Sequence, residues 1–203
     1  MDWLDTIICG DSREVLKQIP DNMIDIVITS PPYNVGMKYN DYNDCQSSED
    51  YFEMLQCVWS ECFRILKLSG RICINTGGFM SGNPMHHIVS QQLRDLGMLW
   101  KGEIIWDKHN YKCNTTAWGS WKSPSAPHLK YTWEFIEIFC KESQKKEGNK
   151  ELIDITGEEF MKWIDAHWRI QPEINMLKYN HPAMFPEELV VRLLKLFSYQ
   201  CDV

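Results

Sequence analysis

The segment that most constrains the fold is an apolar run that ends in two consecutive prolines. Residues 24–28 read Ile-Asp-Ile-Val-Ile, and residues 29–34 continue with Thr-Ser-Pro-Pro-Tyr-Asn. A short run rich in β-branched residues predicts a buried strand. Each proline fixes its own φ, lacks a backbone N–H group and keeps the residue before it out of the helical region. We therefore expect the strand to end in a stiff, extended corner, at the edge where open α/β sheets bind their ligands.

This corner carries groups that suit a planar heterocycle bearing an amino group. The Ser30 hydroxyl and the Pro31 carbonyl can accept the two amino hydrogens, while the Tyr33 ring stacks on the heterocycle. Held in this way, the amino nitrogen directs its lone pair at an electrophile. A Pro-Pro turn that merely ends a strand is the alternative. We favour a site because the whole hexapeptide follows an apolar strand.

The rest of the chain alternates strand and helix patterns, which is typical of an α/β fold. The order strand, Gly-Asp turn, helix, strand at the beginning predicts a parallel sheet. The strand at 133–139 is the expected partner of the strand at 99–106. The predicted strands are 6–9, 24–28, 71–75, 99–106 and 133–139, and the predicted helices are 13–19, 47–70, 84–96, 158–168 and 187–198.

Length and composition are those of one globular α/β domain that covers residues 1–203. No apolar run approaches the ~20 residues of a membrane span, and the first residues carry no basic signal-peptide head. Eight cysteines without a C-x-x-C pair indicate reduced thiols in a cytoplasmic protein with no membrane partner. His86 and His87 lack further ligands at metal-binding spacing, so we predict surface histidines and no metal site.

A net charge of −7 argues against a generally basic surface for nucleic acid. The connection 107–132 differs from this average, because the stretch from Lys108 to Lys130 within it holds four lysines and no acidic residue. Lysines can neutralise phosphates, and tryptophans can stack on bases. We expect DNA contact here, with disorder as the alternative. The residues expected to touch DNA are Lys112, Trp118, Trp121, Lys122 and Lys130. The polar segment and helix at 143–170 are expected to serve packing or target recognition.

The hexapeptide at residues 29–34 resembles motif IV of the amino-group DNA methyltransferases, which use S-adenosylmethionine to methylate cytosine N4 or adenine N6. Two further segments resemble motifs of the same family. Residues 75–78 (Asn-Thr-Gly-Gly) resemble motif VI, and 181–186 (His-Pro-Ala-Met-Phe-Pro) resemble motif X. The resemblance implies a Rossmann-like, mostly parallel sheet with a late antiparallel strand pair. It also implies double-stranded DNA as the partner and a target base that is flipped out of the duplex.

The same resemblance assigns roles to individual residues. It implies catalytic positions at Ser30, Pro31, Pro32 and Tyr33, and cofactor-binding positions at Asp11, Thr29, Asn34, His181, Pro182, Phe185 and Pro186. Asp11 can equally cap the helix that follows it. Serine at the first position of motif IV favours cytosine N4, with adenine N6 as the alternative. Two competing hypotheses are a noncatalytic DNA-binding protein and an enzyme that methylates an amide or amine in protein or RNA.

The resemblance ends where the family order places a glycine loop after motif X. That loop has the form Asp-Pro-Phe-x-Gly-x-Gly, whereas this sequence continues only to Val203 and contains no Gly-x-Gly. We therefore expect an incomplete domain at the C-terminus, poor binding of S-adenosylmethionine by the chain alone, and a complementary polypeptide that carries the missing loop as one way to restore activity.

Overall fold

The computed structural model describes residues 4–39, 42–78, 82–110, 119–174, 176–179, 181 and 183–203. In chain order the helices are α1 Ser12–Val15, α2 Ser48–Ile65, α3 Met85–Asp95, α4 Gly157–Trp163 and α5 Glu187–Phe197, with short 3₁₀ turns at Leu16–Gln18, Lys150–Leu152 and Met176–Tyr179. The strands are β1 Ile24–Thr29, β2 Leu66–Thr76, β3 Leu99–Asp107, β4 Trp133–Cys140 and β5 His167–Arg169.

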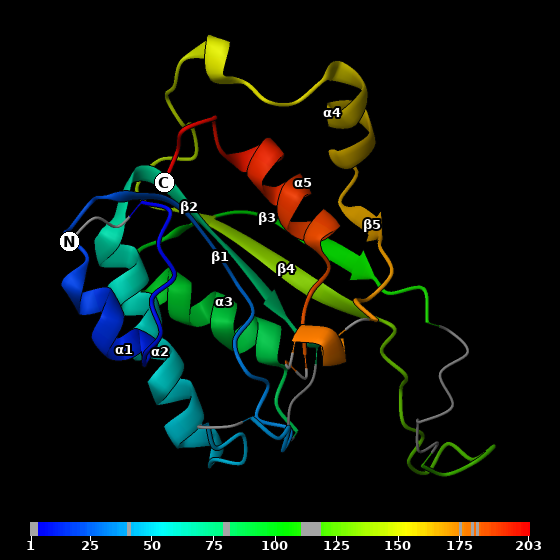
Figure 1. Cartoon of the computed structure of the whole chain (residues 1–203). Helices are drawn as coiled ribbons and strands as arrows, with labels where there is room; N and C mark the ends of the chain where they lie inside the picture. Colours follow the sequence, from blue (N-terminus) through cyan, green and yellow to red (C-terminus); the bar gives the residue numbers. More distant parts are fainter. Residues whose placement is uncertain are drawn as a thin grey trace.

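The strands form one sheet in the order β1-β2-β4-β3-β5. β1 pairs parallel with β2 and β3 pairs parallel with β5, while β4 runs antiparallel to both of its neighbours (Figure 1). The predicted α/β sheet, mostly parallel with a late antiparallel pair, is confirmed. Parallel order brings the carboxyl ends of β1, β2 and β3 to the same edge of the sheet.

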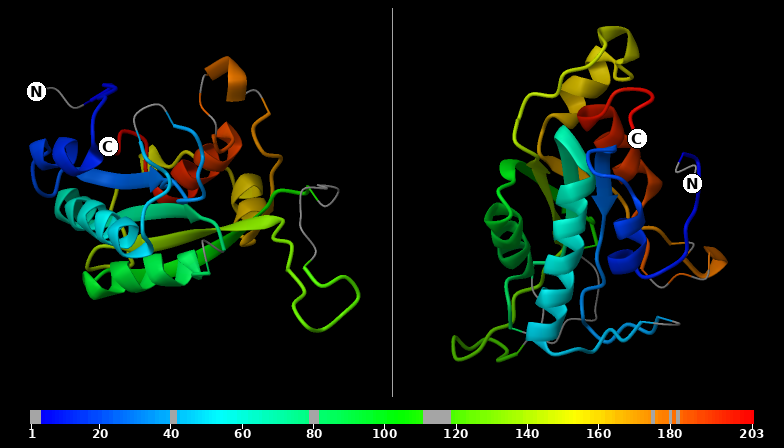
Figure 2. Two further views of the ribbon diagram at one scale, coloured as in Figure 1. Left: turned by 90° about the horizontal axis from the view of Figure 1, so that it is seen from below. Right: turned by 90° about the vertical axis from the view of Figure 1, so that its left-hand side faces the viewer.

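Helices cover both faces of the sheet, which explains why the strands are apolar on both sides. α2 and α3 lie on one face and α5 on the other (Figure 2). Successive side chains of β2 point to opposite faces of the sheet. Ile72 and Ile74 pack with side chains of α2 and α3 on one face. Cys73 packs on the other face with Leu189 and Leu193 of α5.

Local groups at their ends define three of the helices. The Ser47 hydroxyl accepts a hydrogen bond from the Asp50 N–H at 3.1 Å and begins α2. Gly97, with φ of +87°, follows α3 in the left-handed region that glycine adopts at little cost. Pro186 precedes α5 at its N-cap, where its missing N–H removes no helical hydrogen bond.

The strand predicted at 6–9 is wrong. In the described structure these residues have no sheet partner, and Ile7 is 99% exposed. An apolar pattern becomes a strand only where another strand supplies its hydrogen bonds. The helix predicted at 13–19 forms, as α1 followed by a 3₁₀ turn.

The predicted end of the second helix at Gly70 is also wrong, because α2 ends at Ile65. Leu66 adopts extended angles, φ −65° and ψ 135°, and pairs with Ile24 of β1. The apolar spacing through Leu66 fits a helix equally well, so only the neighbouring strand decides the boundary. Gly70 lies within β2, where a Cβ atom would approach the Lys67 carbonyl to 2.8 Å.

The helix predicted at 158–168 ends early, and its last residues form β5. Trp168 is 1% exposed, packs in the core against α5 and donates its indole N–H to the Trp163 carbonyl at 2.9 Å. Burial of this large ring beside β3 outweighs the weak helical periodicity of the segment.

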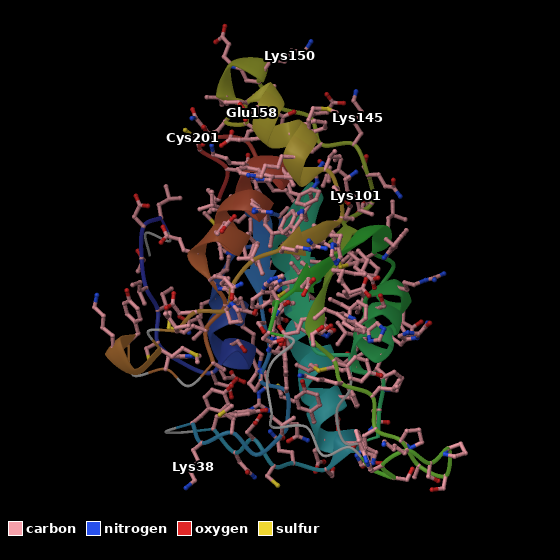
Figure 3. The ribbon with its side chains drawn as sticks, turned by 90° about the vertical axis from the view of Figure 1, so that its right-hand side faces the viewer. Lys38, Lys101, Lys145, Lys150, Glu158 and Cys201 are labelled. Carbon is pink, nitrogen blue, oxygen red and sulfur yellow. The ribbon has the colours of Figure 1, made fainter. Side chains whose placement is uncertain are left out.

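Figure 3 shows Lys145, Lys150 and Glu158 at one end of the molecule and Lys38 at the other.

The histidine pair agrees in part with expectation. His87 is exposed, but His86 is half-buried and stacks on the Phe135 ring with centroids 4.0 Å apart. The described residues contain no cluster of three or more metal-ligating side chains. They also contain no helix that is both long enough and apolar enough to cross a membrane.

Candidate active site at the carboxyl edge of the sheet

A pocket of about 310 Å³ lies where β1, β2 and β3 end and β4 begins. It gathers side chains from the Pro-Pro corner, the following loop, the three strand ends and the segment before α5. The lining includes Ser30, Pro31, Pro32, Tyr33, Val35, Met37, Tyr39, Asp44, Asn75, Trp106, Lys108, Glu134, Pro172, Glu173, Met176, His181, Ala183, Met184 and Phe185. The predicted catalytic residues and much of the predicted motif X therefore face one cavity.

The Pro-Pro corner is held in place from α2. The buried Tyr51 donates its hydroxyl hydrogen to the Pro32 carbonyl at 2.5 Å. Within the described part of the chain, no donor bonds to the Pro31 carbonyl. The Pro32 carbonyl thus fixes the position of the corner, and the predicted contact of the Pro31 carbonyl with a ligand stays a prediction.

Five polar side chains from the Pro-Pro corner and from the ends of three strands meet in the pocket. The Ser30 hydroxyl donates to the Tyr33 hydroxyl at 3.3 Å, and the Tyr33 hydroxyl donates to Oε2 of Glu134 at 3.1 Å. The Asn75 side-chain amide donates to the Tyr33 oxygen at 2.9 Å and to Oε2 of Glu134 at 2.7 Å. Lys108 forms an ion pair with the other carboxylate oxygen of Glu134. Sequence reasoning missed Glu134, which carries no local motif.

Burial of Tyr33, together with the negative charge of Glu134, raises the pKa of the Tyr33 phenol well above its usual value. The phenol therefore remains protonated at neutral pH and acts as a hydrogen-bond donor. Its ring contributes an apolar wall of the pocket, which fits the predicted stacking role.

The loop after the corner is closed by Asp44, which is 3% exposed. Its carboxylate accepts the backbone N–H groups of Asn34, Val35 and Met37 at 2.9, 3.1 and 2.9 Å. The Asn34 side chain turns away from the pocket and exchanges two hydrogen bonds with the backbone of Gln46. Asn34 thus orders the loop, and its predicted contact with the cofactor stays a prediction.

The predicted cofactor residues are only partly brought together. His181 and Phe185 line the pocket, and the His181 ring approaches Tyr39 edge-on at 6.1 Å. Asp11, Thr29 and Pro186 are not among the residues that line it. Pro182 lies outside the described residues.

Asp11 caps α1, as one of its two predicted roles requires. Its carboxylate accepts the Arg13 backbone N–H at 2.9 Å and also binds the Arg13 guanidinium. These hydrogen bonds from Arg13 lower the pKa of Asp11 to about 2.

The described part of the predicted DNA-contacting loop projects from the sheet edge (Figure 1). Trp121 is 68% exposed, and the Lys122 ammonium lies 5.6 Å from the centre of its ring. Gly119, with φ of +65°, pairs with Pro127 and lets the loop turn back on itself. Lys130 is half-buried, whereas Lys112 and Trp118 lie outside the described residues.

Residues 24–203 match the model of a protein family described as DNA methylase, of the N6/N4 type. The chain belongs to the N6/N4 family of DNA methylases. This DNA methylase is 35% identical over 174 residues to the type II methyltransferase M.MjaVI of Methanocaldococcus jannaschii, covering 83% of this chain and 86% of the relative. It is 28% identical to the type II methyltransferase M.BglII of Bacillus subtilis, over 94% of this chain and 56% of that one.

Solved structures of related proteins share the fold. TTHA0409 of Thermus thermophilus, assigned as a DNA modification methylase and solved with S-adenosyl-L-methionine, has a TM-score of 0.71 at 27% identity, over 95% of this chain and 74% of that chain. The cytosine-N4-specific PvuII DNA methyltransferase has a TM-score of 0.64 at 18% identity, over 95% of this chain and 70% of that chain, a likeness of fold alone. The predicted family and fold class are confirmed, while the predicted complementary polypeptide receives no support from these relatives.

Proposed function

We propose that this DNA methylase transfers a methyl group from S-adenosylmethionine to the exocyclic amino group of a base flipped out of double-stranded DNA, with cytosine N4 as the favoured target. The observation that carries the proposal is the cluster of Ser30, Tyr33, Asn75 and Glu134 in the pocket at the carboxyl edge of the sheet. Family membership supplies the reaction class, and this cluster supplies groups suited to an amino substrate.

The amino nitrogen of a stacked and paired base is out of reach, so the base has to leave the duplex. In the pocket its amino hydrogens are accepted by the Ser30 hydroxyl and the Pro31 carbonyl. The Tyr33 ring stacks on its face. Once the amino group is fixed in this way, catalysis is chiefly the positioning of two reactants.

The residues present fit the proposed cofactor. Its sulfonium carries a positive charge and its purine is planar, and the pocket offers acidic and aromatic side chains to such a group. His181, Met184 and Phe185 would hold it from the side of the pocket formed by the segment before α5. When bound, S-adenosylmethionine supplies a methyl group on positively charged sulfur.

Individual residues assign the target base and the surface that contacts DNA. Ser30, rather than aspartate, at the first position of motif IV favours cytosine N4 over adenine N6. Contact with the DNA backbone is assigned to the loop that carries Trp121 and Lys122, because an exposed aromatic ring next to a cation suits both bases and phosphates.

The test is methyl transfer from radiolabelled S-adenosylmethionine to unmethylated phage DNA by purified protein in which a segment carrying the Asp-Pro-Phe-x-Gly-x-Gly loop follows residue 203, with the modified nucleosides identified by mass spectrometry. Ser30→Ala is expected to lower the single-turnover rate by roughly a hundredfold, the usual effect of losing one well-placed catalytic hydrogen bond. DNA affinity is expected to stay unchanged. Ser60→Ala on α2, where the hydroxyl bonds to the Gln56 carbonyl, is the matched control.

The outcomes separate the candidate functions. N6-methyladenine as the product would replace the cytosine assignment and keep the reaction. A wild-type rate in Ser30→Ala would refute the role of the corner. DNA binding without any transfer would favour a noncatalytic DNA-binding protein.

A further inference from the structure

We infer that Glu134 is the terminal proton acceptor of methyl transfer, reached from the target amino group through the hydroxyls of Ser30 and Tyr33. The inference rests on the proposed function and assigns a task to a residue that no motif identifies. Glu134 does not touch the substrate and acts only through the hydroxyls of Ser30 and Tyr33. It is therefore a positioning residue, which orients these hydroxyls and receives the last proton.

The direction of the hydrogen bonds carries the inference. Ser30 donates to Tyr33 at 3.3 Å. Tyr33 donates to Oε2 of Glu134 at 3.1 Å, which is closer than its other acceptor, the Asn75 carbonyl at 3.5 Å. Serine and tyrosine hydroxyls can each donate and accept, whereas a carboxylate only accepts. The chain of donors therefore leads from the expected position of the base to Glu134 and ends there.

The surroundings of Glu134 keep its carboxylate fixed and charge-balanced. Its side chain is 12% exposed. The Asn75 amide donates to Oε2 at 2.7 Å, and the Lys108 ammonium pairs with Oε1 from the end of β3. Other titratable side chains that face the same pocket are Tyr39, Asp44, Glu173 and His181. A carboxylate used only to neutralise Lys108 would not need the two further donors on its second oxygen.

The reaction requires such an acceptor. The amino nitrogen forms a bond to the methyl carbon, the carbon–sulfur bond breaks with its electron pair left on sulfur, and the nitrogen must then lose one proton. Ser30 takes this proton and passes its own to Tyr33, which passes its own to Glu134. Both hydroxyls end neutral, and Glu134 ends protonated.

The environment of Tyr33 agrees with a relay in which no phenolate accumulates. Burial and the Glu134 charge hold the pKa of Tyr33 well above its usual value. Tyr33 therefore releases a proton to Glu134 only as it receives one from Ser30.

The kinetic test compares Glu134→Gln, Tyr33→Phe and the double variant in single turnover on phage DNA, each in the protein with the glycine-loop segment restored. Glutamine keeps the shape and an accepting oxygen but is not a base, and phenylalanine keeps the stacking ring. Each single variant is expected to be about a hundredfold slower, the lower range for loss of proton transfer, with KM for DNA changed less than about twofold. The double variant is expected to be no slower than either single one, because the relay is already broken. Glu137→Gln, on the same strand but outside the pocket, is the control with wild-type rate.

The second readout needs no turnover. In protein labelled with fluorotyrosine, the Tyr33 resonance is identified by its loss in Tyr33→Phe. Glu134→Gln is expected to shift this fluorine resonance, and Glu137→Gln is expected to leave it in place.

Three results would overturn the relay while leaving the proposed function intact: a wild-type rate in Glu134→Gln, multiplicative rate losses in the double variant, or an unmoved resonance. If Glu134→Gln does not fold, a wild-type rate in Tyr33→Phe refutes the relay by itself. If the wild-type protein with the glycine-loop segment restored transfers no methyl group, the proposed function and the relay are overturned together.

Discussion

Glu137 provides a stability test of the sheet that is independent of catalysis. It lies on β4 directly across from Glu103 on β3 and is 3% exposed. Burial, and after it the charge of Glu103, together raise the pKa of Glu137 to about 7. The Trp100 indole donates to its carboxylate at 3.2 Å and offsets part of this effect. Two like charges directly opposite on paired strands are destabilising, so the native protein favours a proton shared by this pair.

The pH dependence follows from this raised pKa. The native state binds the proton more tightly than the unfolded chain, in which the group has an ordinary value of 4.5. The stabilisation is therefore fully present below about pH 4.5 and is lost as pH rises to about 7. Each pKa unit corresponds to about 1.4 kcal/mol, so the loss is at most about 3 kcal/mol, shared between the two partners.

Glu137→Gln removes the ionisation and keeps the shape of the side chain. We expect its free energy of unfolding, measured by urea denaturation, to exceed the wild-type value by about 1–3 kcal/mol near pH 8 and to approach it near pH 4.5. Glu103→Gln should relieve the same repulsion, so the double variant should gain less than the sum of the two. Glu53→Gln, on the exposed face of α2, is the control. An unchanged slope of stability against pH in Glu137→Gln would refute this reasoning.

Two further predictions concern the loops around the pocket. Asp44→Ala should lower the free energy of unfolding by about 2 kcal/mol, because backbone N–H groups such as that of Asn34 lose a charged acceptor; a urea midpoint equal to the wild-type value would contradict this. Changing Lys112, Lys122 and Lys130 together to alanine should weaken DNA binding and reduce the slope of log affinity against log salt by about 0.9 for each phosphate that is no longer neutralised. An identical slope would show that these lysines do not contact the DNA backbone.

Local sequence determined the parts of this protein whose conformation depends on neighbours in the chain. The prolines at 31 and 32 end β1 in an extended corner, because their rings restrict the backbone whatever surrounds them. Pro186 and the apolar spacing after it likewise suffice to predict α5.

Tertiary structure decided the features that depend on a partner far along the chain. Residues 6–9 have a strand pattern but no partner in the described structure, whereas Leu66 leaves a helical pattern because Ile24 offers parallel pairing. The site shows the same dependence. Glu134 lies 101 positions after Tyr33, and only the antiparallel pairing of β2 with β4 brings its carboxylate to the phenol. No spacing in the sequence encodes that contact, because it is set by the register between two strands.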